Sequence, residues 1–180
     1  MASPQAPIPV KLVIAVLFSD EQLLQTAWYR LINEFGEIDY TSPRFPFDAT
    51  DYYAPEMGES IERLFVSFSN LIPPDRLAEI KLRTNEIENE LAVDNKRKIN
   101  LDPGYLDTDK FVLASGKYHG FKIYLSDGIW ADMTLHYEKG KFSAMPWSFP
   151  DFRSGAYNEV FIRIREIYKR NLNATAKHQG

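Results

Sequence analysis

Cysteine is absent from the 180-residue sequence, and histidine occurs only three times. Without cysteine the chain can form no disulfide, no thiolate zinc site and no cysteine nucleophile. The absence is typical of a protein that resides in a reducing compartment, so we expect a cytoplasmic location. Because His119, His136 and His178 lack the paired spacing of a histidine metal site, we expect no such site.

Long apolar runs and an excess of basic residues are also missing. The apolar segment 12–18 is far too short to cross a bilayer, and no secretory leader pattern precedes it. The sequence has 21 Lys and Arg residues against 25 Asp and Glu residues, for a formal net charge of −4. Such a balance gives no general attraction for nucleic acid or for an anionic membrane, and we expect neither as a partner.

The remaining composition is that of a globular protein. Hydrophobic residues make up 44% of the chain and charged residues 26%. No repeat, linker or low-complexity tract divides the sequence, so we predict a single domain over residues 1–180. Within it we expect residues 1–9 to be flexible and the polar tail at residues 172–180 to fray.

The first hundred residues alternate between strand and helix patterns. The apolar run 12–18 suits a central strand covered on both faces. Ser19 and Gln22 have the spacing of a capping box, which predicts that a helix begins at Ser19. The predicted order is strand 12–18, helix 19–36, strand 38–47, an irregular segment 48–59, strand 63–68, helix 73–91 and strand 98–101. This order predicts an α+β protein with a ferredoxin-like βαββαβ core.

The later residues extend that core. Residues 108–118 fit either a helix or a strand, and we favour a helix because Thr108 can cap it. Asp127-Gly128 is a strong hairpin signal between strands 121–125 and 129–137, and Lys139-Gly140 leads into strand 142–145. A final helix capped by Ser154 completes the pattern. We therefore predict that an antiparallel hairpin or meander and a C-terminal helix extend the core.

Several short motifs have counterparts in a known family, and together they are specific. They are Phe47-Asp48, Thr50 to Tyr53, Glu56-Met57-Gly58, Lys81 with Thr84-Asn85, Asn100 to Leu106, Tyr124-Leu125, Asp127-Gly128-Ile129, Pro146-Trp147 and Pro150-Asp151. From Lys11 to about Tyr168 the chain resembles the uncharacterised bacterial and archaeal family DUF4416, which implies a prokaryotic source. The family carries no agreed activity. Some relatives bear a GTP-binding label, but Gly116-Lys117 and Gly140-Lys141 lack the flanking residues of a P-loop.

Three groups of polar residues are candidates for a site. Asp48, Asp51 and Glu56 lie in the irregular segment, where carboxylates suit Mg²⁺ or Ca²⁺ but where Asp is also an ordinary turn residue. Asp102-Pro103-Gly104-Tyr105 fits a type II turn, in which Asp102 could act as a ligand or general base and Asn100 could orient a substrate. On the second helix, Lys81, Asn85 and Glu88 share one face, which could grip a polar ligand or form a solvated flank.

We predict that residues from these groups converge on one site for a small polar, phosphorylated or nucleotide-like ligand. The predicted ligand-binding residues are Asp48, Asp51, Lys81, Asn85, Asn100, Asp102 and Tyr105. One alternative is a divalent-metal-dependent hydrolase or transferase that uses the same loop carboxylates. Another is a non-catalytic interaction protein that uses an open sheet edge or its aromatic surface. The sequence identifies no cofactor and no oligomeric state.

Overall fold

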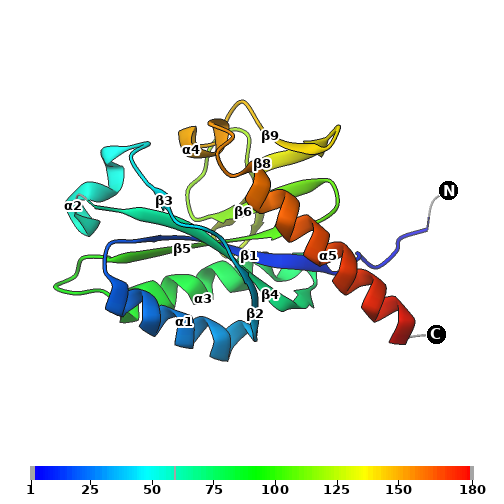
Figure 1. The fold of residues 1–180 in the computed structure, drawn as a ribbon, viewed down its shortest axis with the longest axis horizontal. Coiled ribbons are helices and arrows are strands. Elements are labelled where there is room, and N and C mark those ends of the chain that lie inside the picture. Colours follow the sequence, from blue (N-terminus) through cyan, green and yellow to red (C-terminus); the bar gives the residue numbers. More distant parts are fainter. Residues whose placement is uncertain (1–2, 59, 179–180) are drawn as a thin grey trace.

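The computed structural model describes residues 3–58 and 60–178, apart from the side chains of Asp51 and residues 176–178. It is a mixed α+β protein with one large antiparallel sheet (Figure 1). The strands are β1 (Val10–Phe18), β2 (Ile38–Thr41), β3 (Phe45–Pro46), β4 (Glu62–Ile72), β5 (Ile99–Leu106), β6 (Lys110–Ser115), β7 (Ile123–Ser126), β8 (Ile129–Glu138) and β9 (Lys141–Ala144). The helices are α1 (Glu21–Phe35), α2 (Ala54–Met57), α3 (Leu77–Glu90), α4 (Pro150–Arg153) and α5 (Asn158–His178), with short 3₁₀ helices η1 (Asp51–Tyr53) and η2 (Pro74–Arg76).

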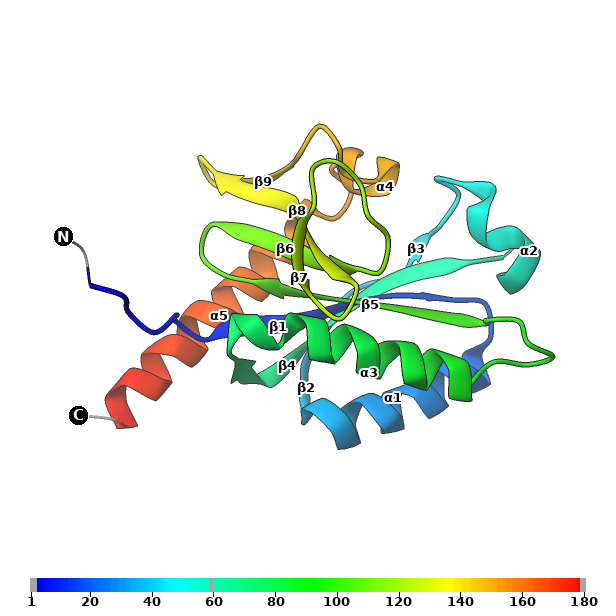
Figure 2. The same cartoon turned by 180° about the vertical axis from the view of Figure 1, so that it is seen from behind.

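The strands pair in the order β2-β4-β1-β5-β6-β8-β7, while β3 pairs with β4 and β9 pairs with β8. Every pair of neighbouring strands is antiparallel. Helices α1 and α3 lie on one face of the sheet, whereas α2 and α4 lie on the other (Figure 1). From behind, α3 runs alongside β5 (Figure 2).

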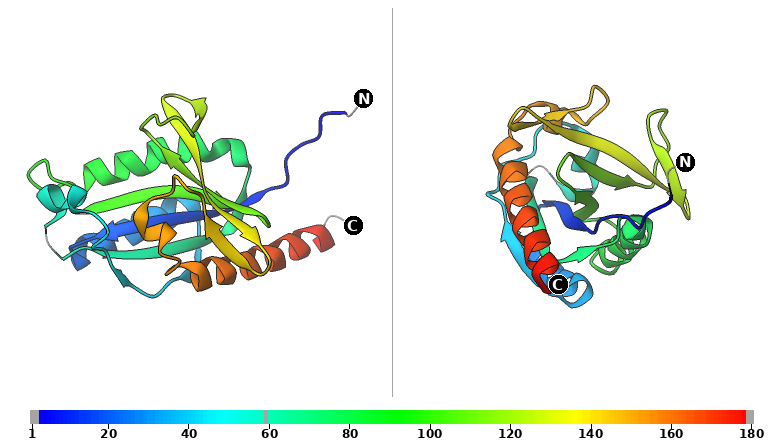
Figure 3. Two further views of the ribbon diagram at one scale, coloured as in Figure 1. Left: turned by 90° about the horizontal axis from the view of Figure 1, so that it is seen from above. Right: turned by 90° about the vertical axis from the view of Figure 1, so that its right-hand side faces the viewer.

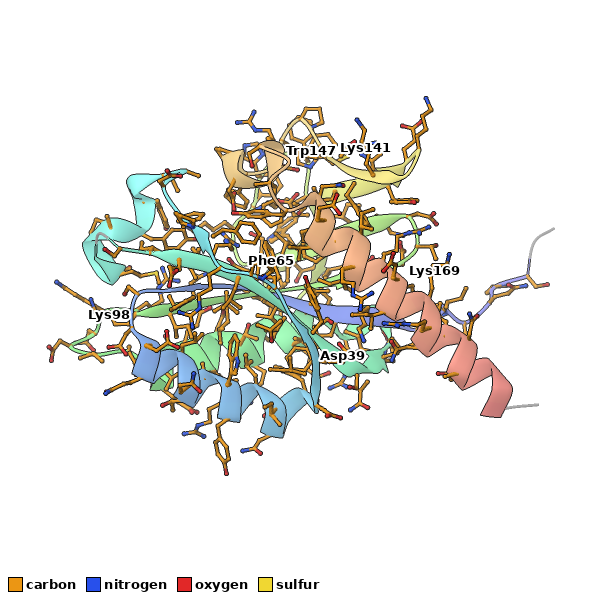
Figure 4. The ribbon with its side chains drawn as sticks, viewed as in Figure 1. Asp39, Phe65, Lys98, Lys141, Trp147 and Lys169 are labelled. Atoms are coloured by element: carbon orange, nitrogen blue, oxygen red, sulfur yellow. The ribbon has the colours of Figure 1, made fainter. Side chains whose placement is uncertain are left out.

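Strand β1 is buried over its whole length because both faces of the sheet are covered, as its apolar sequence predicts. Leu12, Ile14 and Val16 pack against α1 and α3. The alternate side chains of Val13 and Ala15 face the other way, into a core with α5. Figure 3 shows α5 and α3 on opposite sides of the sheet, and Figure 4 places Phe65, which packs against α5, near the centre of the molecule.

A charged residue interrupts this apolar strand. Lys11 is fully buried, and its Nζ forms an ion pair with Asp39. The same Nζ lies 3.4 Å from Oδ1 of Asn171 on α5, and the Tyr168 hydroxyl donates a hydrogen bond of 2.8 Å to the carbonyl of Pro9. These contacts tie the first strand to the last helix.

The cap of α1 is Asp20 rather than Ser19, so the predicted capping box is wrong. Oδ1 of Asp20 accepts hydrogen bonds from the backbone N–H groups of Gln22 and Leu23, at 2.9 and 3.0 Å. The Ser19 hydroxyl instead donates to the carbonyl of Met57. An aspartate in the next position can cap the same turn, and it also places a negative charge at the positive end of the helix dipole.

The segment Asp102-Pro103-Gly104-Tyr105 is not a turn but part of the continuous strand β5, so the type II turn prediction is wrong. Gly104 is required by close packing, because a Cβ atom there would lie 2.6 Å from the carbonyl oxygen of Val112 and 2.8 Å from the ring of Phe111. Pro103 and Gly104 both fit a strand that has one partly open edge, as described below.

Residues 108–118 contain strand β6, so the favoured helix is wrong. The side chain of Asp107 accepts hydrogen bonds from the backbone N–H groups of Asp109 and Lys110 and forms a turn into the strand. Phe111 and Leu113 face the core with α5, whereas Val112 and Ala114 pack with residues of α3. A short run that is buried on both faces has no periodicity that separates strand from helix.

The two predicted hairpins are confirmed. Asp127 and Gly128 both have positive φ, of 51° and 77°, as do Lys139 and Gly140, at 51° and 86°. The last helix starts at Asn158 instead of Ser154, because α4 and a short turn intervene.

The ends of the chain differ in structure. Residues 3–9, where we expect flexibility, form no helix or strand, and residues 1–2 lie outside the described residues. The expected frayed tail is helical as far as His178, and residues 179–180 lie outside the described part. No helix among the described residues is long and apolar enough to span a membrane.

Candidate functional site

Charged side chains gather at the end of the sheet where β1 ends and β5 begins. Strand β6 pairs with β5 only from Gly104 to Leu106, whereas β1 pairs with all of it. Residues 99–103 of β5 therefore have no neighbouring strand on their second side within the described structure. Backbone N–H and C=O groups on such an edge need other partners.

Helix α3 supplies these partners with two side chains. Oε1 of Glu88 accepts a hydrogen bond of 2.6 Å from the N–H of Leu101, and Nζ of Lys81 donates one of 3.0 Å to the carbonyl of the same residue. The two side chains are seven positions apart, so they project from the same face of the helix. Pro103, two residues after Leu101, has the same orientation, and its missing N–H therefore falls on this open side.

Asn100 and Asp102 project from the opposite face of β5 to Leu101 and meet the end of Lys81. Nζ of Lys81 lies 3.0 Å from Oδ1 of Asp102, and Nδ2 of Asn100 donates a hydrogen bond of 2.6 Å to Oδ2. Asn100 is buried, but the side chain of Asp102 is 27% exposed. The carboxylate is thus held on two sides and is partly open to solvent.

Arg97, in the connection between α3 and β5, joins these residues to α2. Its Nη1 lies 3.2 Å from Oδ1 of Asn100 and 3.4 Å from Oε2 of Glu88, and its Nε donates a hydrogen bond of 2.7 Å to Glu56. Its Nη2 forms no hydrogen bond with a described residue, and the side chain is 30% exposed. We call Lys81, Glu88, Arg97, Asn100 and Asp102 the edge network.

The pKa values of the two carboxyl groups of the edge network are shifted in opposite directions. Burial alone would raise the pKa of Asp102, but the charges of Lys81 and Arg63 and hydrogen bonds from Lys81 and Asn100 outweigh it and hold the pKa below its usual value. Glu88 is only 4% exposed, and burial raises its pKa to about 7 despite nearby Lys81. The arrangement therefore holds one ionised carboxylate beside one carboxyl that exchanges a proton near neutral pH.

A second polar group lies beneath α4. Nη2 of the buried Arg63, on β4, is 3.2 Å from Oδ2 of Asp151, and the Tyr157 hydroxyl donates a hydrogen bond of 3.2 Å to the same oxygen. The guanidinium also lies 4.9 Å from the centre of the Phe47 ring. Burial raises the pKa of the Tyr157 hydroxyl well above its ordinary value, which keeps it protonated as a donor. The charge of Arg63 also acts on Asp102, so both groups lie at the same end of the sheet.

The structure brings three of the predicted site residues together, namely Lys81, Asn100 and Asp102. Asn85 is half-buried one turn along α3, and its side chain forms no hydrogen bond with a described residue. Tyr105 projects from the other face of β5 and packs with the apolar core there. Asp48 is exposed near the second group, and Asp51 begins η1 with a side chain that lies outside the described residues. The seven predicted residues thus do not form one cluster.

Sequence reasoning gave no site role to Arg63 or Arg97, and it named Glu88 and Asp151 without including them among the predicted ligand-binding residues. Glu88 carries a signal, because it shares a helix face with Lys81. Arg63 carries one too, since it is a charged residue beside the otherwise apolar run of β4. Asp151 belongs to the motif Pro150-Asp151, whereas Arg97 has no signal, because a single charge in a connection is common.

The arrangement favours binding through hydrogen bonds and charge. Among the described residues, no three His, Asp or Glu side chains lie close enough together to hold a metal ion. The partly exposed groups of the edge network are the carboxylate of Asp102 and the guanidinium of Arg97. Together they offer an acceptor for hydroxyl groups and a donor for an anion.

Comparisons with known proteins agree with the sequence motifs. No curated protein and no solved structure matches the chain. A family model described as a domain of unknown function, DUF4416, matches residues 8–168, which is most of the chain. The chain therefore belongs to the DUF4416 family.

Proposed function

We propose that the protein binds a small polar ligand that carries hydroxyl and phosphate groups, such as a sugar phosphate or a nucleotide, at the edge network. The observation that carries this proposal is the convergence of Lys81, Asn100 and Asp102 from two separate elements. Residues 19 positions apart in sequence, Lys81 and Asn100, both contact the one carboxylate of Asp102. That carboxylate is partly exposed, as a ligand-binding group must be.

The chemistry of each group suggests its role. The carboxylate of Asp102 is ionised at neutral pH and accepts hydrogen bonds from ligand hydroxyls. The unpartnered Nη2 of Arg97 is free to donate to a phosphate oxygen, and the planar guanidinium suits that geometry. Asn100 holds both groups, because its Oδ1 accepts from Arg97 and its Nδ2 donates to Asp102. Lys81 adds a second positive charge behind them.

The edge network also has a structural role, since it satisfies the backbone of Leu101. The two roles separate by residue. Glu88 and the Lys81 bond to Leu101 serve the strand edge, whereas Nη2 of Arg97 and the exposed side of Asp102 serve no contact with a described residue. A ligand test should therefore change Arg97 and Asp102 and leave Glu88 intact.

The experiment is a thermal-shift titration with AMP, ribose 5-phosphate, ribose and inorganic phosphate. We expect AMP or ribose 5-phosphate to raise the Tm in a concentration-dependent way, because a ligand that binds only the folded state stabilises it. The substitutions Arg97→Lys and Asp102→Asn should each reduce that rise, measured against the unliganded Tm of the same variant. Arg153→Lys, at an exposed residue, is the matched control. If no compound raises the Tm, or if both site variants respond like the wild type, the proposal is wrong.

We also infer that β1, α1, β2, β4, α3 and β5 form a ferredoxin-like core. The supporting features are the strand order β2-β4-β1-β5, its antiparallel pairs and the position of α1 and α3 on one face. An experimental structure that placed β2 next to β1 would contradict this inference.

A further inference from the structure

A cavity of about 480 Å³ lies apart from the edge network, between two segments that are distant in sequence. One wall is β3 with the residues that follow it, and the other is α4 with the turn into α5. Its volume falls in the range of small-molecule sites, which is about 300–1,000 Å³. The lining residues are Phe45, Pro46, Phe47, Asp48, Ala49, Pro150, Asp151, Ser154, Ala156 and Tyr157.

The walls are mainly apolar, and three of the ten lining residues are aromatic. The rings of Phe45 and Tyr157 lie 5.0 Å apart at an interplanar angle of 72°, and Phe47 is buried beside them. Aromatic rings offer apolar surface for packing, and their negative faces also attract cations. Arg63 makes such a cation–π contact, since its guanidinium lies over the ring of Phe47. A cation that entered the cavity would meet the same kind of surface.

The polar atoms of the cavity are acceptors that are only partly used. Asp151 is 7% exposed, and its Oδ2 contacts both Arg63 and Tyr157, but its Oδ1 accepts no hydrogen bond from a described residue. Asp48 is exposed at the rim and forms no hydrogen bond or ion pair within the described part of the chain. Oδ1 of Asp151 is not one of the fully buried polar atoms without a partner, so solvent reaches it and it is accessible to a donor that enters the cavity.

The charges of the lining residues have one sign. Asp48 and Asp151 are the charged residues of the lining, and Arg63 behind Asp151 neutralises one of them. The cavity therefore has an excess negative charge near Asp48. An anion would be repelled here, whereas a cation with an apolar body would satisfy the carboxylates and the rings together.

We propose that this cavity binds a small organic cation, in which a protonated amine or guanidinium group is attached to an apolar or aromatic body. The cationic group donates a hydrogen bond to Oδ1 of Asp151 and lies near the charge of Asp48. The apolar body packs against the rings of Phe45 and Tyr157. This site is separate from the edge network, so it stands whether or not a phosphate ligand binds there.

The test uses three probes of the same shape, phenethylamine, 2-phenylethanol and phenylacetate, which differ in charge. Binding is measured by titration of the isotope-labelled full chain, followed by backbone amide shifts in NMR spectra. We expect phenethylamine to bind about tenfold more tightly than 2-phenylethanol, because a charged donor roughly doubles the strength of a hydrogen bond to a carboxylate. The shifted amides should be those of residues 45, 47–49 and 151–157, since Pro46 and Pro150 have no N–H group.

Asp48→Asn is the decisive variant, because the Asp48 side chain is exposed and forms no hydrogen bond or ion pair with a described residue, so its change should leave the fold intact. We expect it to weaken phenethylamine binding about threefold, as for a partly screened charge pair. Asp127→Asn, which removes one negative charge from a distant turn, is the matched control and should bind like the wild type. Equal affinity for the amine and the alcohol, tighter binding of phenylacetate, amide shifts elsewhere, or unchanged affinity in the Asp48 variant would each overturn the proposal.

Discussion

Oε1 of Glu88 accepts a hydrogen bond of 2.6 Å from the backbone N–H of Leu101. Through this bond a helix side chain takes the place that a neighbouring strand would otherwise fill. Nζ of Lys81 likewise donates a hydrogen bond to the carbonyl of Leu101, which a neighbouring strand would otherwise do. The edge of β5 is thus covered by charged groups instead of being left to pair with another chain.

The pH dependence of stability follows from Glu88. Its pKa in the folded protein is about 7, above the ordinary value of 4.5. The folded state therefore binds this proton more tightly than the unfolded state, so the stabilisation is fully present below about pH 4.5 and is lost as the pH rises to about 7. The glutamine variant Glu88→Gln keeps the neutral form at every pH and lacks this loss.

The measurement is urea unfolding of the wild type and of Glu88→Gln from pH 5 to pH 8. We expect the free energy of unfolding of the variant to rise relative to the wild type by roughly 2–4 kcal/mol over this range, from a shift of about two to three pKa units. Glu90→Gln, on the exposed side of the same helix, is the control. A constant difference between Glu88→Gln and the wild type would contradict the prediction.

Removal of the Lys81 ammonium should destabilise the fold. Lys81→Met keeps most of the side-chain length but leaves Oδ1 of Asp102 and the carbonyl of Leu101 without their donor. We expect a loss of about 2–3 kcal/mol, less than for a fully buried pair because Asp102 is partly exposed. Lys169→Met, on the exposed face of α5, should change the stability by less than about 0.5 kcal/mol. Similar unfolding curves for the two variants would show that the edge network contributes little.

Gly104 should tolerate no side chain. In Gly104→Ala the new Cβ meets the backbone of β6 and the ring of Phe111, so we expect a loss of about 1–3 kcal/mol from overpacking. Gly116→Ala is a sharp comparison, because a Cβ there has nothing within 4 Å and φ lies outside the left-handed region. That change should be neutral or slightly stabilising. The Tm values of Gly104→Ala and Gly116→Ala, each compared with the wild type, test this prediction. An equal change in Tm at both positions would contradict the close packing of Gly104 against β6.

The first turn of α1 should depend on Asp20 and not on Ser19. Asp20→Ala removes the acceptor of two backbone N–H groups, and we expect it to cost about 1 kcal/mol. Hydrogen exchange gives the direct measurement. The amides of Gln22 and Leu23 should lose protection in Asp20→Ala and keep it in Ser19→Ala. The reverse result would restore Ser19 as the cap.

The sequence predicts the order of the elements well where periodicity is strong. The apolar run of β1, the buried stripe of α1 and the turns at Asp127-Gly128 and Lys139-Gly140 depend on local patterns, and all are found. The predicted turn at Pro103-Gly104 is wrong for a physical reason. Turn chemistry and packing at a partly open strand edge both favour Pro and Gly, and the second cause depends on β6, which a local pattern does not contain.

The candidate site divides in the same way. Lys81, Asn100 and Asp102 could be found because their residue types exceed what helix or turn formation requires. Arg97 could not, and neither could the pairing of Asp151 with Arg63, since these partners come from separate elements brought together by folding. The prediction that Tyr105 belongs to this site is wrong, because side chains alternate along a strand and Tyr105 therefore lies on the face opposite to Asp102.

The contacts between Lys11 and α5 have a consequence for synthesis on the ribosome. Asn171 is made 160 residues after Lys11, so the nascent chain exposes the α5-facing side of its central strand until α5 has been made. A product that stops short of α5 leaves Phe65 and its neighbours uncovered, and such surfaces are what chaperones bind and proteases cleave. Formation of α5 therefore covers the core surface that chaperones and proteases would otherwise recognise.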